Sequence, residues 1–562
     1  MHKQMKKTFK HIITFGVVAV GALLLTSAAS DPTYKLGKNV EILVNMLRNV
    51  SLFYVDEVDA DKLTEAAAQG MSRLLDPYTT YLPSESMDDF ATMTTGKYGG
   101  VGSLIRQKGE WVEFTAPYKD SPADRAGIRP GDRIVEIEGR SAKGMKSVEV
   151  SSLLKGDPGS VVKLSVEKFP TGEVKQLKIK RERIAIPGVP YHGMVADSIG
   201  YISHTDFTEG CSADLLAAYK ELDSLGMKAL ILDYRGNSGG ILQEAVKILS
   251  IFLPKGTEVV STRSPKNPRI NETFRTENAP LSLDMPIVVL TNSGTASAAE
   301  IVAGALQDTD RAALVGQRTF GKGLVQRTFP LGHSAYAKVT TAKYYLPSGR
   351  CVQAIDYAHR NEDGSVASVP DSLISEFKTV AGRRVYDGGG VMPDVVLEPQ
   401  YVSTFAYVVY GMGHVDDFVN EYCRKHYDAL SVVPGEYEFG KEAYGEFLDY
   451  MKDKEVAWES EAQRHWKQFK AAAEKERWNK DMAAQIEAIE QNISNNTEEN
   501  LLLYRTELSD IIEDNIVSRY CYSEGGIRHS LQEDTELRAA IELLQHPDHY
   551  HTIITSQDTA RK

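Results

Sequence analysis

The stretch PIVVLTNSGTASAAE, residues 286–300, begins with an apolar run and continues through small polar residues into a helical pattern. A buried strand that turns sharply into a helix exposes its turn residue at the helix N-terminus, where developing negative charge is favoured. Ser297 occupies this turn. Lys322 follows 25 residues later, between Gly321 and Gly323. These features predict an α/β domain with a reactive serine.

A lysine is the nearest candidate base for this serine, because no histidine occurs between His204 and His333. The flanking glycines allow Lys322 to lie deep in a pocket, and burial lowers a lysine pKa toward the range of a general base. Taken singly, Ser297 is more often a helix N-cap and Lys322 a solvated surface charge. Together they favour a serine hydrolase with a lysine base.

A second strand-turn-helix unit lies upstream, in LILDYRGNSGG, residues 230–240, before a helical pattern over 241–249. The backbone N–H groups of a glycine turn can approach a substrate closely, and two such donors form an oxyanion hole. A phosphate-binding loop is the competing interpretation. It is disfavoured because the turn lacks the Gly-x-x-x-x-Gly-Lys-Ser/Thr spacing.

Two segments, TASAAEI (residues 295–301) and TFGKGLVQ (residues 319–326), resemble the nucleophile and lysine motifs of the carboxyl-terminal processing, or tail-specific, serine proteases. The resemblance implies that Ser297 is the nucleophile and Lys322 the general base. It also implies that Gln326 orients the lysine.

The same resemblance implies an oxyanion hole formed by the backbone N–H groups of Ala298 and Gly240, with Gly239 beside them. Three positions depart from the commonest family pattern, and none carries a reacting group: Thr295, Ala299 and Ser238.

An upstream block resembles a PDZ domain on the segments YGGVGSLI, residues 98–105, and SPADRAGIRPGDRIVEIEG, residues 121–139. A glycine-rich loop ahead of a strand offers N–H groups to a chain-terminal carboxylate, and the strand edge accepts the peptide as an added strand. The alternative is another small β-rich domain with glycine turns. The expected carboxylate-binding residues are Gly99, Gly100, Val101 and Gly102.

The chain of 562 residues is too long for one hydrophobic core and is expected to divide into domains. The predicted fold class is multidomain α/β: a protease core with strand-turn-helix units, an inserted small β-rich PDZ domain, and helical regions at both ends. The expected divisions are a signal peptide or membrane anchor (1–30), an N-terminal helical region (31–97), the PDZ domain (98–183), the serine protease core (184–400) and a C-terminal helical appendage (401–562).

The first 30 residues have the layout of an export signal, with Lys3, Lys6, Lys7 and Lys10 ahead of an apolar stretch over 12–25. Cleavage after Ala29 and retention as a membrane anchor both remain open. We expect the folded body outside the cytoplasmic membrane, in the periplasm or cell envelope.

Composition excludes several classes of partner. The net charge of −13 and the absence of a basic tract argue against nucleic acid. Four scattered cysteines form neither a zinc motif nor a disulfide framework, so buried free thiols are expected, with one or two disulfides as the alternative. Neither a metal nor a cofactor is required by serine chemistry. The helical pattern over 36–75 either pairs subunits or packs within the monomer.

The sequence therefore predicts a serine endopeptidase that captures protein C-termini on a PDZ domain and cleaves exported proteins through an acyl-enzyme. The expected partners are protein substrates, which bind through their C-termini. An adaptor protein or assembly into a homo-oligomer is also possible. Gating of the active site by the PDZ domain is a hypothesis. The main alternative is a non-catalytic PDZ adaptor, and a third is an acyl-transfer or hydratase enzyme.

Overall fold

The computed structural model describes residues 32–169, 171–361, 363–426, 430–478, 482–493 and 496–555, so the predicted export signal lies outside the described residues. The chain divides into two compact units. One contains residues up to Met87 together with Gln326–Thr340, and the other contains the remainder. Each unit is described by itself.

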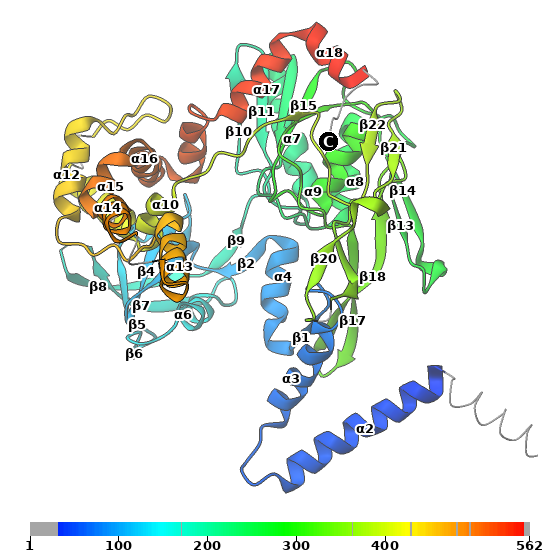
Figure 1. The fold of residues 1–562 in the computed structure, drawn as a ribbon, viewed down its shortest axis with the longest axis horizontal. Coiled ribbons are helices and arrows are strands. Elements are labelled where there is room, and N and C mark those ends of the chain that lie inside the picture. The colour runs from blue at the N-terminus through cyan, green and yellow to red at the C-terminus, as the bar shows by residue number, and fades with distance from the viewer. Residues whose placement is uncertain are drawn as a thin grey trace, which may run out of the picture. The chain divides into compact units, whose positions relative to one another are not determined.

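The larger unit is built around a six-stranded sheet in the order β10-β11-β12-β15-β16-β23 (Figure 1). From β11 onward neighbouring strands run parallel, and only β10 is antiparallel. The bounds are β10 Tyr191–Ala196, β11 Ile199–Ser203, β12 Ala229–Asp233, β15 Ile287–Thr291, β16 Ala313–Gly316 and β23 Val395–Val396. Because β12 and β15 are buried on both faces, they read in the sequence as continuous apolar runs.

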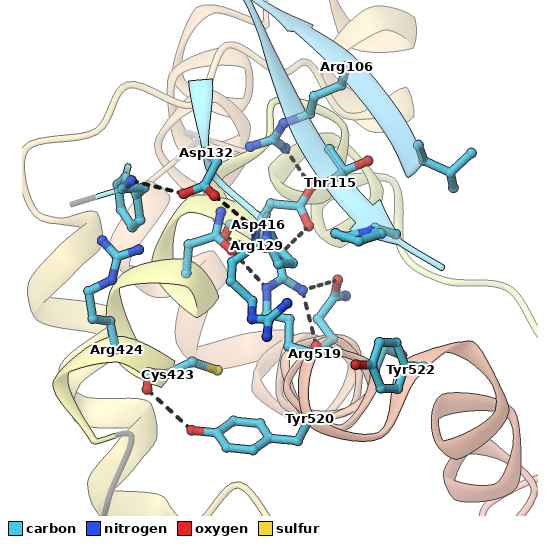
Figure 2. A pocket seen from close by; sticks show the side chains of 18 of the residues that line it. Arg106, Thr115, Arg129, Asp132, Asp416, Cys423, Arg424, Arg519, Tyr520 and Tyr522 are labelled. Carbon is cyan, nitrogen blue, oxygen red and sulfur yellow. Dashed lines mark hydrogen bonds and ion pairs between the residues drawn. The ribbon is translucent and has the colours of Figure 1, made fainter. Parts of the chain in front are cut away.

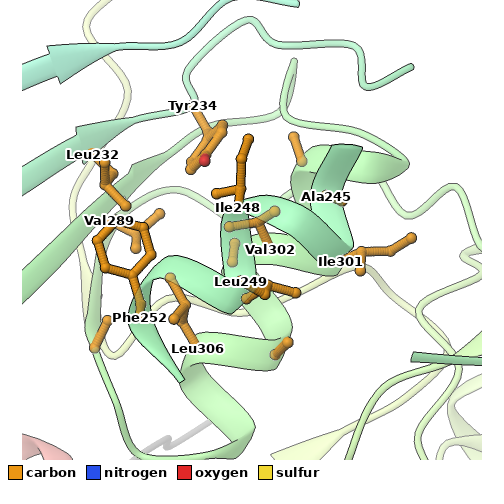
Figure 3. Close-up of a cluster of buried hydrophobic side chains, with 14 of the residues drawn as sticks. Leu232, Tyr234, Ala245, Ile248, Leu249, Phe252, Val289, Ile301, Val302 and Leu306 are labelled. Atoms are coloured by element: carbon orange, nitrogen blue, oxygen red, sulfur yellow. The ribbon is translucent and has the colours of Figure 1, made fainter. Parts of the chain in front are cut away.

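Helices cover both faces of this sheet. Leu232 and Val289 face α7 (Cys211–Ser224), α8 (Leu242–Phe252) and α9 (Ala298–Asp308), and Figure 3 shows Phe252 and Leu306 packed there. The alternate residues of the same strands face α17 (Thr535–Gln545) and α18 (Pro547–Thr555). The helices α17 and α18 therefore pack on the sheet whose strand β15 leads to Ser297.

The PDZ region is an antiparallel sheet in the order β3-β4-β5-β7-β8, so β3 is an edge strand. Its elements are β3 Ser103–Lys108, β4 Trp111–Pro117, α5 Pro122–Arg125, β5 Arg133–Ile137, β6 Arg140–Ser141, α6 Ser147–Leu154, β7 Val161–Lys168 and β8 Glu173–Lys180. The antiparallel pair β2 (Lys97–Gly100) and β9 (Glu182–Ala185) joins the two ends of this region.

The helices α10, α11, α12, α15 and α16 form a separate core around Phe405, Phe418, Phe447 and Ile512. The bounds of the C-terminal helices are α10 Thr404–Gly411, α11 His414–Lys425, α12 Lys441–Met451, α13 Glu461–Lys475, α14 Ala483–Ile493, α15 Thr497–Leu503 and α16 Arg505–Ser530. Tyr522 has a positive φ of 58° and kinks α16. The four cysteines are free thiols in this structure, with Cys211 and Cys423 buried.

The PDZ sheet contacts the helices through ion pairs beside a cavity of about 810 Å³ (Figure 2). Arg106 on β3 donates to Asp416 at 2.6 Å and to Asp417 at 2.8 Å, and Lys108 donates to Asp417 at 2.7 Å. Tyr522 donates from α16 to Asp124, at 3.1 Å to each carboxylate oxygen.

The described part of the smaller unit includes the helices α2 (Pro32–Phe53) and α3 (Ala60–Arg73), the strand β1 (Thr80–Leu82), and parts of β17 and β18. β1 pairs with β18 at Tyr336–Lys338, and β17 pairs with β18 in a hairpin. No helix of the described residues is long and apolar enough to cross a membrane. The remaining elements are α4 Met87–Thr95, β13 Glu258–Arg263, β14 Glu272–Arg275, β17 Leu324–Gly332, β18 Ala335–Tyr345, β19 Ile355–Arg360, β20 Val366–Ser368, β21 Glu376–Lys378 and β22 Arg384–Tyr386.

Candidate active site

Ser297 lies at the turn between β15 and α9 in a conformation that non-glycine residues rarely adopt, with φ 56° and ψ −116°. Such strain persists only where the surroundings enforce it, and it is typical of a nucleophile turn between a strand and a helix. Two contacts enforce it here. The Thr295 hydroxyl donates to the carbonyl of Tyr234 at 2.8 Å, and the Tyr344 hydroxyl donates to the carbonyl of Ser297 at 3.2 Å.

The carboxylate of Glu300 joins the serine turn to the lysine loop. Its Oε2 accepts from the backbone N–H groups of Ser297 and Lys322, each at 2.8 Å. Its Oε1 accepts from Gly321 N at 2.8 Å and from the Thr319 hydroxyl at 2.6 Å. Burial raises the pKa of the Glu300 carboxyl, and the four donors that bond to it oppose this shift.

No role is predicted for Glu300 from the sequence motifs. The sequence contains one indication of a role: Glu300 lies three residues after Ser297, which is the spacing of a helix capping box. That pattern predicts the bond to Ser297 N. The bonds to the lysine loop depend on the packing of residues 319–322 against α9, which the local sequence does not reveal.

The predicted oxyanion turn lies directly against the serine turn. A side chain at Gly239 would place its Cβ 2.7 Å from both Ala298 N and Ser297 Cβ, so only glycine fits there. Ala296 N donates to the carbonyl of Asn237 at 2.9 Å, and this bond joins the two turns.

The N–H groups of this turn are not equivalent. Gly239 N donates to Asn237 Oδ1 at 2.8 Å and is therefore engaged within the turn. The N–H groups of Gly240 and Ala298 donate to no acceptor in the part of the chain that the structure describes. These two groups have the properties of oxyanion donors, whereas Gly239 contributes by its lack of a side chain.

Lys322 is half-buried in a loop whose glycines pack tightly. A Cβ at Gly321 would lie 2.5 Å from Ala354 Cβ, and one at Gly323 would lie 2.9 Å from Gln353 N. The backbone of this loop is therefore closely confined on both sides of the lysine.

Gln326 belongs to the smaller unit, where its amide donates to the Thr340 hydroxyl at 3.1 Å. The Thr340 hydroxyl donates in turn to Asp76 at 3.1 Å. Asp76 also accepts from the backbone N–H groups of Tyr78 and Thr79, at 2.9 and 2.8 Å. Since the nitrogen and oxygen of an amide point in opposite directions, this chain of bonds fixes the orientation of the Gln326 side chain.

A fully buried histidine lies beneath the oxyanion turn. The carbonyl of His204 accepts from Asn237 Nδ2 at 2.7 Å, while its ring contacts the rings of Phe207 and Tyr234. Burial lowers the pKa of His204 to about 4, so the ring is neutral at pH 7. No three His, Cys, Asp or Glu side chains of the described residues are placed to hold a metal ion.

The predicted carboxylate loop lies directly before the edge strand β3. Gly102 has a φ of 78°, and a Cβ there would lie 2.6 Å from Ser121 Cβ. The carbonyl of Val101 accepts from Ala123 N at 2.8 Å. The backbone of Gly99 lies in close contact with the backbone of Gly156. Gly100 ends the strand β2. Contacts with Ser121, Ala123 and Gly156 therefore restrict the conformation of this loop.

Three family models match the chain: Peptidase family S41 over residues 198–358, a PDZ domain over 113–168, and the C-terminal helical domain of probable PDZ-proteases over 405–544. The carboxy-terminal-processing protease of Bartonella bacilliformis is 38% identical over 340 residues, covering 60% of this chain and 77% of that protein. The chain belongs to the carboxy-terminal processing protease family. This protease is accordingly a serine-type protease with a PDZ domain, and the predicted α/β fold class is confirmed.

Two further relatives are similar to this protease. The carboxy-terminal processing protease CtpA of Bacillus subtilis is 33% identical over 357 residues, covering 63% of this chain and 76% of that protein. The solved structure of a photosystem II D1 C-terminal processing protease is 28% identical, with a TM-score of 0.35 and coverage of 64% of this chain and 88% of that chain.

Proposed function

We propose that Ser297 and Lys322 form the catalytic dyad of this protease. The observation that carries the proposal is the Glu300 carboxylate, which bonds the backbone of both residues and so holds the two loops in one fixed arrangement. Fixed mutual placement is what a nucleophile and its base require.

In the proposed reaction the neutral Lys322 amine takes the proton of Ser297 Oγ as the oxygen attacks the scissile carbonyl carbon. The N–H groups of Gly240 and Ala298 stabilise the resulting oxyanion. Collapse of the tetrahedral intermediate breaks the C–N bond, and the lysine ammonium gives its proton to the leaving amine. Lys322 then deprotonates a water that attacks the acyl carbon. The bond between Ser297 Oγ and the acyl carbon breaks, and the lysine ammonium returns the proton to Ser297 Oγ.

Gln326 is proposed to orient the amine of Lys322. Support comes from the bonds through Thr340 to Asp76, which restrict the Gln326 amide to one orientation. A side chain held in this way has little rotational entropy left to lose when it acts on the lysine.

The proposed substrates are exported or cell-envelope proteins captured by their C-termini. The free edge of β3 supports this, because an extended peptide can add to it as a further strand while its carboxylate meets the loop over residues 99–102. Export is supported by the layout of the first 30 residues. The divisions at residues 30, 97, 183 and 400 are also proposals, and α17 and α18 pack on the sheet of the protease core, together with Ile527 of α16.

The test compares degradation of a model protein bearing an apolar C-terminal tail by the unmutated protease, Ser297→Ala and Lys322→Ala. Each variant is expected to lose at least about a thousandfold in cleavage rate while it retains tail binding. Cleavage by Ser297→Ala would contradict the proposed nucleophile. Tail binding without cleavage by the unmutated protein would instead indicate an adaptor.

A further inference from the structure

Arg235 lies at the start of the proposed oxyanion turn and is surrounded by three carboxylates. Its Nε donates to both oxygens of Asp233 at 3.0 Å. Its Nη1 donates to Glu536 at 2.8 Å, and its Nη2 donates to Asp534 at 2.6 Å. Only 18% of the Arg235 side chain is exposed, so these are partly desolvated bonds and stronger than surface pairs.

Two of the three carboxylates come from the far end of the chain, about 300 residues away in sequence. Asp534 is the N-cap of α17 and accepts from Leu537 N at 2.9 Å, while Glu536 lies in the first helical turn. The partial positive charge of the helix N-terminus stabilises both carboxylates beside a single guanidinium. Gln317 also donates to Glu536.

Helix α17 is itself fixed on the sheet. Leu537, Ala540 and Leu543 are buried against it. The Tyr550 hydroxyl in α18 bonds to both the N–H and the carbonyl of Ile287, each at 3.0 Å. The packing of α17 on the sheet therefore fixes the positions of Asp534 and Glu536 beside Arg235.

The position of Arg235 determines where the turn begins. Its N–H donates to Asp233 Oδ1 at 2.9 Å, and the next residue, Gly236, donates to Asn292 in the serine turn at 2.9 Å. The guanidinium holds this corner through its bonds to Asp233, Asp534 and Glu536. Displacement of the corner would shift Gly240, and oxyanion donors act only within a narrow distance range.

We propose that Asp534 and Glu536 are positioning residues for the protease reaction. They hold Arg235, and through it the turn that presents Gly240 to the substrate carbonyl. The C-terminal end of the chain thus completes the active site. The inference rests on the proposed function of the Ser297 site and names a new contributor to it.

The test uses the full-length protease and the double variant Asp534→Asn/Glu536→Gln. Asparagine is as good an N-cap as aspartate, so α17 keeps its cap while the charges are lost. Competent sites are counted by labelling Ser297 with a fluorophosphonate, and a short peptide substrate is then used to measure kcat per labelled site and KM. We expect kcat per site to fall about ten- to hundredfold, with KM changed less than about threefold.

Two control variants distinguish loss of the carboxylate contacts to Arg235 from looser packing of α17 on the sheet. Glu542→Gln removes an exposed carboxylate of α17 and is expected to leave kcat unchanged. Leu543→Ala loosens the helix without touching Arg235, and it is expected to lower the melting temperature but not kcat per labelled site. An unchanged kcat in the double variant, or an equal loss in Leu543→Ala, would overturn the inference. Failure of the unmutated protein to label at Ser297 would contradict the proposed function itself, and this inference with it.

Discussion

The carboxylate of Glu300 accepts four hydrogen bonds in a position without solvent exposure. Three of its donors are backbone N–H groups, whose positions are fixed by the chain path rather than by side-chain rotation. Removal of the carboxylate leaves buried donors unpaired, and each costs about 1–3 kcal/mol. At the scale of single residues, Glu300 links the stability of the fold to the proposed arrangement of Ser297 and Lys322.

The Glu300→Gln variant keeps the shape of the side chain but places an NH₂ group against N–H donors. We expect the free energy of unfolding to fall by about 2–4 kcal/mol and kcat by about a hundredfold. Urea unfolding and peptide hydrolysis measure the two effects. Glu209→Gln, an exposed position, is the matched control. An unchanged kcat in Glu300→Gln would show that the bonds to the two loops do not position the site.

His204 predicts a pH dependence of stability. The unfolded state binds a proton near pH 6.5, whereas the folded state binds it only near pH 4. Its contribution is therefore fully present above about pH 6.5 and is lost as the pH falls toward 4, by about 3 kcal/mol in total. A hydrogen bond with the Asp206 backbone and the charge of Glu244 oppose this shift of the pKa without cancelling it.

Unfolding by urea between pH 4.5 and 8 measures this contribution. We expect the stability of the unmutated protease to decline more steeply below pH 6.5 than that of His204→Phe, which has no proton to bind. The exposed His549→Phe is the control and should follow the unmutated curve. Parallel curves for His204→Phe and the unmutated protease would contradict the assignment.

At the scale of elements, the strands that deliver the two turns are fixed from both faces. β12 and β15 lie between α8 and α9 on one face and α17 and α18 on the other. Close packing on both faces fixes the position of a strand, and so it also fixes the position of the turn that follows the strand.

Tyr550→Phe tests the clamp at the start of β15. The variant leaves the N–H and the carbonyl of Ile287 without their hydroxyl partner in a buried position. We expect the free energy of unfolding to fall by about 1–3 kcal/mol, measured by urea denaturation. Tyr407→Phe, whose side chain is exposed, should have no measurable effect. Equal stability of the two variants would show that the Tyr550 bonds contribute nothing net.

At the scale of the larger unit, the PDZ sheet is joined to the C-terminal helices by polar contacts beside a cavity. The ion pairs of Arg106 and Lys108 with Asp416 and Asp417 leave between 22% and 39% of each side chain exposed. Pairs of this kind contribute at most about 1 kcal/mol each and are weakened by salt. Both cations lie on β3, the strand expected to receive the substrate tail.

Asp416→Asn/Asp417→Asn should therefore loosen β3. We expect amide hydrogen exchange in β3 to accelerate about three- to tenfold in this variant, and 0.5 M NaCl to have a similar effect on the unmutated protease. Asp453→Asn, an exposed position, is the control. Exchange that responds neither to the substitution nor to salt would show that these pairs do not restrain the strand.

The sequence alone determined the two strand-turn-helix units, the PDZ block and the family, because their signals are local. Apolar runs predict buried strands, and glycines mark positive φ at Gly239 and Gly102. The tertiary structure alone revealed how Glu300 joins the serine and lysine loops, how Thr340 and Asp76 hold Gln326, and how α17 reaches Arg235. These contacts join residues 22, 264 and 301 positions apart. The local hydrophobic pattern predicts which face of a helix or strand is buried. Which residues pack against that face depends on how the whole chain folds.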